Sequence, residues 1–256
     1  MNGIPSQHIV VNGLCLHYQR AGRGEAVLVL HGWGGSVATV QPLVQYLTQN
    51  HSVVVLDLPG HGQSSMPPNV WTVSDYMACV VQAMDLLELQ RVHIVGHSFG
   101  ARIAIKLAVA HPQRVDKLVL LNAAGVRPPR GMRYYGRYAI GRLGKALAAC
   151  FGKLGRRAQS RLYSLAASPD YLRSGPLRET FVKVVNEDLR PLLPSVRPPA
   201  LLIWGASDKD TPPMLGRIMA REMSNAQLVV LEGAGHFCYI DQPMKVGLLV
   251  NKFLRG

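Results

Sequence analysis

Three side chains far apart in the sequence have the types and the order of a hydrolytic triad: Ser98, Asp208 and His236. A serine hydroxyl is a weak nucleophile at its ordinary pKa, so it needs a base within hydrogen-bond distance and a third group that fixes the tautomer of that base. Each of the three residues follows an apolar run typical of a buried strand. We therefore expect Ser98 to attack a carbonyl carbon, His236 to take the proton and Asp208 to orient the imidazole.

The serine stands at the centre of a G-x-S-x-G pattern, residues 96–100. An apolar run at 92–95 precedes it and an apolar helical pattern begins at Ile103, which predicts a sharp turn from a strand into a helix. Such a turn is strained and closely packed, and the two glycines of the pattern supply the small neighbours that it needs. The turn is expected to expose the Ser98 hydroxyl and to place the backbone N–H of Phe99 beside it.

A second glycine-rich loop, His31-Gly32-Trp33-Gly34-Gly35-Ser36, follows the apolar run at 26–30. The oxyanion of a tetrahedral intermediate needs two preorganised hydrogen-bond donors, each worth about 3 kcal/mol in catalysis. The backbone N–H groups of Trp33 and Phe99 meet this requirement. We expect them to form an oxyanion hole.

Two further residues are weaker candidates for the triad roles. Asp210 is an alternative orienting acid, but Asp208 stands nearer the end of its strand and is favoured. His61 lies between two turn glycines in the loop at 57–64, where a histidine more often caps or packs than reacts. We expect no cofactor and no metal site.

The elements that must position these loops alternate along the chain. Two β-prone runs joined by Asn12-Gly13 predict an opening hairpin. The short apolar runs predict a mainly parallel sheet with helices on both faces, which is an α/β fold. In such sheets, ligands bind at the carboxyl ends of the strands. The predicted strands are 26–30, 52–56, 92–95, 115–121, 200–204 and 227–231, and the predicted helices are 41–48, 76–87, 103–109, 214–223 and 243–254.

The alternation stops between residues 125 and 196. This segment lacks strand-like apolar runs and predicts helices at 138–151 and 176–189. An insert of this length with its own helices is expected to form a helical cap over the site. We therefore predict an α/β core of 1–124 and 197–256 and a cap of 125–196 that holds the substrate-binding side chains.

The chain of 256 residues carries a formal net charge of +13, most of it within 122–196, where basic residues greatly outnumber acidic ones. One interpretation is a solvated helical surface. The other is a field that attracts an anionic substrate, an acidic carrier protein or a membrane surface. No basic motif interleaved with aromatic residues accompanies the charge, which argues against nucleic acid as a partner.

The sequence has no apolar run approaching the ~18 residues that a membrane span requires, so no transmembrane segment is expected. Residues 1–7 lack the basic start and the apolar stretch of a signal peptide, which favours a cytoplasmic location. Cys15, Cys79, Cys150 and Cys238 show no C-x-x-C spacing, and we expect all four to be reduced.

Taken together, the loops resemble those of the α/β-hydrolase superfamily over nearly the whole chain. The motifs that carry this resemblance are His31-Gly32-Trp33-Gly34, Asp57-Leu58-Pro59-Gly60-His61-Gly62-Gln63-Ser64, Gly96-His97-Ser98-Phe99-Gly100, Gly205 with Asp208 and Pro212, and Gly233-Ala234-Gly235-His236. The resemblance implies Ser98 as nucleophile, His236 as base, Asp208 as orienter, the N–H groups of Trp33 and Phe99 as oxyanion hole, and 125–196 as a lid. Serine rather than aspartate at the elbow argues against the epoxide hydrolases and haloalkane dehalogenases of the same fold.

The activity expected from these features is that of a cofactor-free serine carboxylesterase acting on small to medium acyl esters. The resemblance also leaves open an esterase for a pimeloyl-type methyl ester on an acyl carrier protein, and a hydrolase of carbon–carbon bonds in vinylogous diketones. A fourth possibility belongs to another class, since some members of the superfamily are ligand receptors with slow or no turnover.

Overall fold

The computed structural model describes residues 4–127 and 169–256. The chain divides into two compact units, one formed by 1–126 with 183–256 and the other by 127–182. The helix predicted at 138–151 and most of the predicted cap lie outside the described residues, so the role of this segment as a cap stays a prediction.

Within the described residues, one sheet of eight strands runs in the order β1-β2-β4-β3-β5-β6-β7-β8. The strands are β1 (Ser6–Val11), β2 (Leu14–Ala21), β3 (Ala26–Leu30), β4 (Ser52–Leu56), β5 (Val92–His97), β6 (Val115–Leu121), β7 (Ala200–Gly205) and β8 (Ala226–Leu231). β2 pairs antiparallel with β1 and β4, and every other pair is parallel. The predicted hairpin and the mainly parallel α/β sheet are confirmed.

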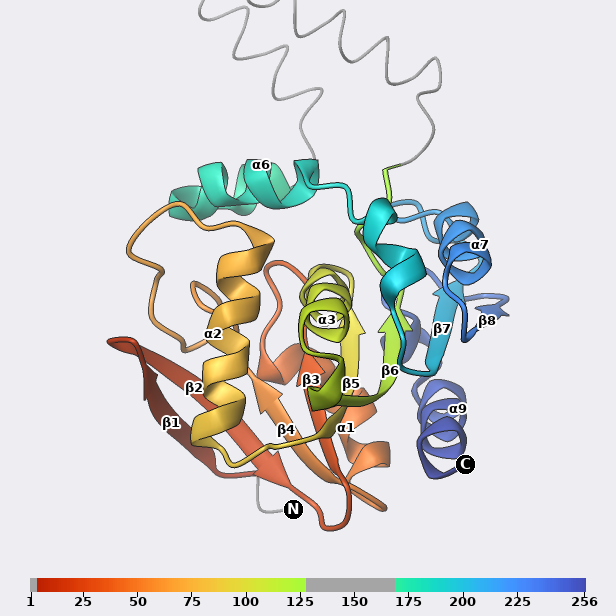
Figure 1. Cartoon of the computed structure of the whole chain (residues 1–256), viewed down its shortest axis with the longest axis horizontal. Helices are drawn as coiled ribbons and strands as arrows, with labels where there is room; N and C mark the ends of the chain where they lie inside the picture. The colour runs from red at the N-terminus through yellow and green to blue at the C-terminus, as the bar shows by residue number, and fades with distance from the viewer. Residues whose placement is uncertain (1–3, 128–168) are drawn as a thin grey trace, which may run out of the picture. The chain divides into compact units, whose positions relative to one another are not determined.

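Alternate residues of each strand contribute to two hydrophobic layers, one on each face of the sheet, because successive side chains of a strand point to opposite faces. In β3, Leu28 and Leu30 belong to the layer that also contains side chains of α2 (Val73–Leu86), α3 (Phe99–Ala110) and α7 (Pro213–Glu222). Val27 and Val29 belong to the layer that also contains side chains of α1 (Gln41–Leu47), α8 (Cys238–Asp241) and α9 (Pro243–Arg255). Figure 1 shows α2 and α3 crossing the near face of the sheet. Helices cover both faces of the sheet, and this explains why the parallel strands are continuous apolar runs in the sequence.

The segment that follows β6 is hydrogen-bonded to the segment that precedes β7. The backbone N–H of Leu189 donates to the carbonyl of Gly125 at 2.7 Å, and Arg102 of α3 donates through Nη1 to the carbonyl of Glu187 at 2.7 Å. Glu187 also forms an ion pair with Lys106. These bonds anchor both ends of the inserted segment on the core.

Two short helices, α5 (Pro169–Arg173) and α6 (Arg178–Asn186), occupy the described end of the insert. The helix predicted at 176–189 is therefore shorter than expected: residues 187–189 are not helical, and a separate 3₁₀ helix follows at Arg190–Ser195. Pro191 lies in the first turn of that 3₁₀ helix, where its missing backbone N–H is tolerated. Of the described helices, none has both the length and the apolar character that a membrane crossing requires.

Candidate active site

Ser98 is the single residue that joins β5 to α3. Its backbone has φ 47° and ψ −105°, a strained conformation for a residue with a Cβ. The turn is also crowded, since a Cβ at Gly100 would lie 2.2 Å from the carbonyl oxygen of Leu30, and a Cβ at Gly96 would lie 2.8 Å from Cα of Ala101. The two glycines of the G-x-S-x-G pattern therefore permit the sharp turn that the sequence predicts.

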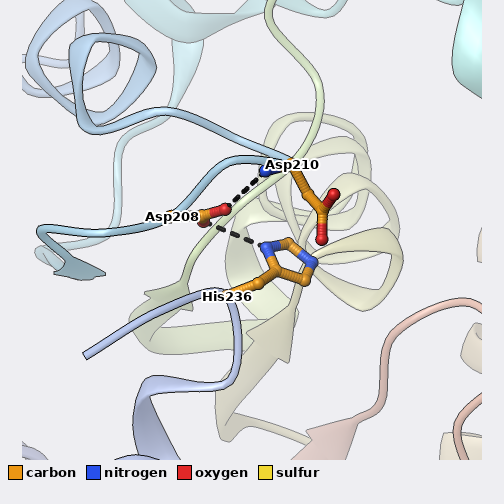
Figure 2. A group of neighbouring side chains, drawn as sticks. All are labelled: Asp208, Asp210 and His236. Atoms are coloured by element: carbon orange, nitrogen blue, oxygen red, sulfur yellow. Dashed lines mark hydrogen bonds and ion pairs between the residues drawn. The ribbon is translucent and has the colours of Figure 1, made fainter.

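Asp208 and His236 follow neighbouring strands, and their side chains are in contact. His236 Nδ1 lies 3.0 Å from Asp208 Oδ2. Figure 2 shows the two groups facing each other, Asp208 on the loop after β7 and His236 on the loop after β8. The carboxylate accepts, so Nδ1 carries the proton and Nε2 presents a lone pair. This tautomer suits a general base.

Asp208 is buried, at 4% exposure, and both oxygens of its carboxylate accept hydrogen bonds. Its Oδ2 also accepts from Asn122 Nδ2 at 2.6 Å and from Thr211 Oγ1 at 2.7 Å. Its Oδ1 accepts from the backbone N–H groups of Asp210 and Thr211, each at 2.9 Å. Burial alone would raise the pKa of Asp208, but hydrogen bonds from His236, Thr211 and Asn122 lower that pKa to about 2. The Asp208 carboxylate is therefore ionised at neutral pH.

Asn122 and Thr211 are site residues that the sequence interpretation missed. Asn122 directly follows β6, is fully buried and has φ 44°, a left-handed conformation that asparagine tolerates. Its Nδ2 lies 3.1 Å from the carbonyl of Gly235 as well, so one amide joins Asp208 to the loop of His236. The feature of the sequence that could have indicated Asn122 is its position directly after the predicted strand at 115–121, because ligands bind at the carboxyl ends of such strands.

Ser98 and His236 are not joined in the way that Asp208 and His236 are. Among the described residues, no hydrogen bond joins the Ser98 hydroxyl to the imidazole of His236. The link runs instead through the preceding residue, because His97 Nε2 lies 2.9 Å from the backbone oxygen of His236. The structure thus pairs Asp208 with His236, and the reaction of Ser98 with this pair stays a prediction.

The loop at 31–36, here called the oxyanion loop, lies against the serine. A Cβ at Gly32 would be 3.4 Å from Ser98 Cβ, and the rings of Trp33 and Phe99 meet edge to face at 5.1 Å. Phe99 is the first residue of α3, and the first N–H groups of a helix have no acceptor within it. This arrangement agrees with the predicted oxyanion hole, whose role remains a prediction.

His61, which the sequence disfavours as a catalytic group, is packed among neighbouring side chains, and its role stays a prediction. It is 6% exposed, its Nδ1 lies 3.0 Å from the carbonyl of Pro59, and its ring meets Trp33 edge to face at 4.9 Å. Burial lowers the pKa of His61. In the same loop, Asp57 accepts from the backbone N–H of Val37 at 2.5 Å, which fixes the chain just after the oxyanion loop.

One group of potential metal ligands comes together in the part of the chain that the structure describes: Asp208, Asp210 and His236, with ligand atoms within 4.8 Å of one another. Asp210 is exposed, and its carboxylate lies beside the imidazole in Figure 2. Both oxygens of Asp208 already accept hydrogen bonds from the protein, and one of these comes from the imidazole of His236. Nearby Cys238 is buried, and burial raises the pKa of its thiol to about 12.

Comparisons with known proteins identify the family to which this chain belongs. A model of the alpha/beta hydrolase family matches residues 27–246. A 2-hydroxy-6-oxononadienedioate/2-hydroxy-6-oxononatrienedioate hydrolase of Dechloromonas aromatica (strain RCB) is 30% identical, over 94% of this chain and 91% of its own. A pimeloyl-[acyl-carrier protein] methyl ester esterase of Neisseria meningitidis is 28% identical, over 90% of this chain and 93% of its own. The solved structure of the enol-lactonase from Burkholderia xenovorans LB400 has a TM-score of 0.77 at 25% identity, covering 98% of this chain and 100% of that one. The chain described here belongs to the alpha/beta hydrolase family.

Proposed function

We propose that this hydrolase is a serine carboxylesterase that cleaves esters of small to medium acyl groups. His236 takes the proton of the Ser98 hydroxyl as its oxygen attacks the ester carbonyl, and gives that proton to the departing alcohol. Water, deprotonated by His236, then attacks the acyl-enzyme and releases the acid and the serine. The observation that carries the proposal is the 3.0 Å contact between Asp208 and His236 beside the strained Ser98 turn.

A graded ester panel tests this proposal. The wild-type protein should hydrolyse p-nitrophenyl acetate, butyrate and octanoate, and Ser98→Ala should reduce each rate to background. Far-UV circular dichroism of the variant should match the wild type, because the hydroxyl is not part of the core. A Ser98→Ala protein that keeps most of the rate would overturn the mechanism.

A carrier-bound ester is the second candidate substrate, supported by the name of the Neisseria meningitidis relative and by the net charge of +13. Acyl carrier proteins are acidic, so surface charge would accelerate their encounter with this chain. Hydrolysis of a methyl ester on a carrier protein should then fall steeply with added salt, while hydrolysis of a small neutral ester should not. Equal salt dependence of the two rates would argue against the carrier.

A vinylogous diketone belongs in the same panel, because the Dechloromonas aromatica relative is named as a hydrolase of such a compound. Cleavage of the diketone with no ester turnover would assign carbon–carbon bond hydrolysis. Tight binding of a ligand without turnover of any substrate would assign a receptor.

A further inference from the structure

His97, the residue before Ser98, lies where three loops of the site meet. It is 3% exposed. On one side its ring touches the oxyanion loop, since a Cβ at Gly32 would lie 2.7 Å from His97 Nδ1. On another side its Nε2 lies 2.9 Å from the backbone oxygen of His236. One side chain thus contacts the elements that carry the nucleophile, the oxyanion donors and the base.

The tautomer of His97 follows from its partner. A carbonyl oxygen only accepts, so Nε2 carries the hydrogen and donates it, while Nδ1 has no partner within the described residues. Burial, and then the nearby His236, lower the pKa of His97 to about 3. His97 is therefore neutral under ordinary conditions and acts as a fixed donor, not as an acid or base.

Aromatic packing reinforces this bond. The ring of His97 lies 5.0 Å from the ring of His236, 5.2 Å from that of Phe237 and 5.0 Å from that of Tyr239. Tyr239 is buried and Phe237 is half exposed, so this cluster of rings reaches from the core to the surface. The loop of His236 is thus held by one hydrogen bond from the His97 side chain to its backbone and by three ring contacts.

We propose that His97 is a positioning residue that sets the place of the His236 imidazole relative to the Ser98 hydroxyl. The inference rests on the proposed function, in which these two groups react. One peptide bond connects His97 to the nucleophile and one hydrogen bond connects it to the base. Because a small misplacement of a catalytic group costs up to about 100-fold in rate, a bond at this point affects turnover more than substrate binding.

Four variants separate positioning from packing. His97→Gln keeps a donor at the end of the side chain, where Nε2 stands. His97→Asn places its donor one atom short of the His236 carbonyl, and His97→Leu fills the volume without a donor. His51→Leu is the matched control, since His51 is also a buried histidine, at 1% exposure, and directly precedes β4.

We expect kcat for a p-nitrophenyl ester to fall about 10-fold to 100-fold in His97→Asn and His97→Leu, with KM within about threefold of the wild type. His97→Gln should regain most of the lost rate, and His51→Leu should keep the wild-type kcat. Equal rates in the Gln and Asn variants would overturn the inference. This comparison holds even where the Leu variant fails to fold.

A second readout does not depend on turnover. The hydrogen that His236 Nδ1 shares with Asp208 should give a downfield proton resonance, sharp in the wild type and in His97→Gln and broadened or shifted in His97→Asn. An unchanged resonance in all three proteins would contradict positioning by His97. If no ester is hydrolysed but the resonance responds as expected, the proposed function fails and the positioning role stands.

Discussion

The amide of Asn122 lies 2.6 Å from the carboxylate of Asp208 and 3.1 Å from the carbonyl of Gly235, and so joins Asp208 to the loop that carries His236. The contact spans β6, β7 and the chain after β8, which are adjacent in the sheet. Asn122 therefore fixes the distance between two side chains that arrive from different strands.

Replacing Asn122 with alanine should lower kcat about tenfold, because a hydrogen bond to a charged group contributes about 1.5–3 kcal/mol and its loss also removes the link between Asp208 and the loop of His236. Steady-state kinetics on a p-nitrophenyl ester measures this. Asn251→Ala is the control, since Asn251 is also buried and its Nδ2 donates to the backbone of Tyr46 at 3.0 Å, away from the site. A similar loss of rate in both variants would mean general destabilisation.

Asp208→Asn should lower kcat by roughly 1,000-fold to 10,000-fold, because an amide at this position favours the wrong tautomer of His236. Asp210→Asn should stay within a few-fold of the wild type, since Asp210 contributes its backbone N–H to Asp208, and the substitution keeps that group. The reverse ranking of the two variants would make Asp210 the orienting acid.

The Ser98 turn should not tolerate a side chain at Gly100. Gly100→Ala places a Cβ 2.2 Å from the carbonyl of Leu30, so we expect the free energy of unfolding to fall by about 3 kcal/mol and activity to be lost. Gly235→Ala is the steric control, because its Cβ would lie 3.6 Å from the nearest atom, Asp241 Oδ2. Urea unfolding of both variants checks the prediction, and a stable Gly100→Ala protein would contradict it.

Buried histidines predict acid sensitivity, and His97 and His31 are the two whose pKa values burial lowers furthest. Burial lowers the pKa of His97 to about 3 and that of His31 to about 4, from an ordinary value of 6.5. Between those values the unfolded chain binds protons that the folded chain does not, so their contribution to stability is complete above pH 6.5 and declines as the pH falls. Each histidine adds a slope of about 1.4 kcal/mol per pH unit.

Urea unfolding between about pH 7.5 and pH 4.5 measures this slope. In His97→Gln, the slope of the free energy of unfolding against pH should be smaller by the contribution of one histidine, about 1.4 kcal/mol per pH unit. The pKa of Asp208 is lowered as well, to about 2, and the stability that it contributes is lost only at more acidic pH, as the carboxylate takes a proton. A free energy of unfolding that is flat between pH 6.5 and pH 4.5 would contradict the burial of neutral His97 and His31.

The sequence alone predicted the parallel sheet, because its buried strands are short apolar runs, and it predicted the Ser98 turn from glycine spacing. It also placed Asp208 and His236 each on a loop after a predicted strand. The role of Asn122 could not be predicted in this way, since that role depends on β6 lying beside β7 in the sheet. The bond from His97 to His236 likewise joins distant residues whose spacing in the chain carries no signal.

Covalent labelling tests the central claim, that Ser98 is the nucleophile activated by His236, most directly. A fluorophosphonate should add once per chain, and tryptic mass spectrometry should find the adduct on the peptide 92–102, which runs from after Arg91 to Arg102 and contains Ser98. The adduct should be absent from Ser98→Ala and form far more slowly in His236→Gln. Labelling of another residue, or equal labelling of Ser98→Ala, would contradict the account.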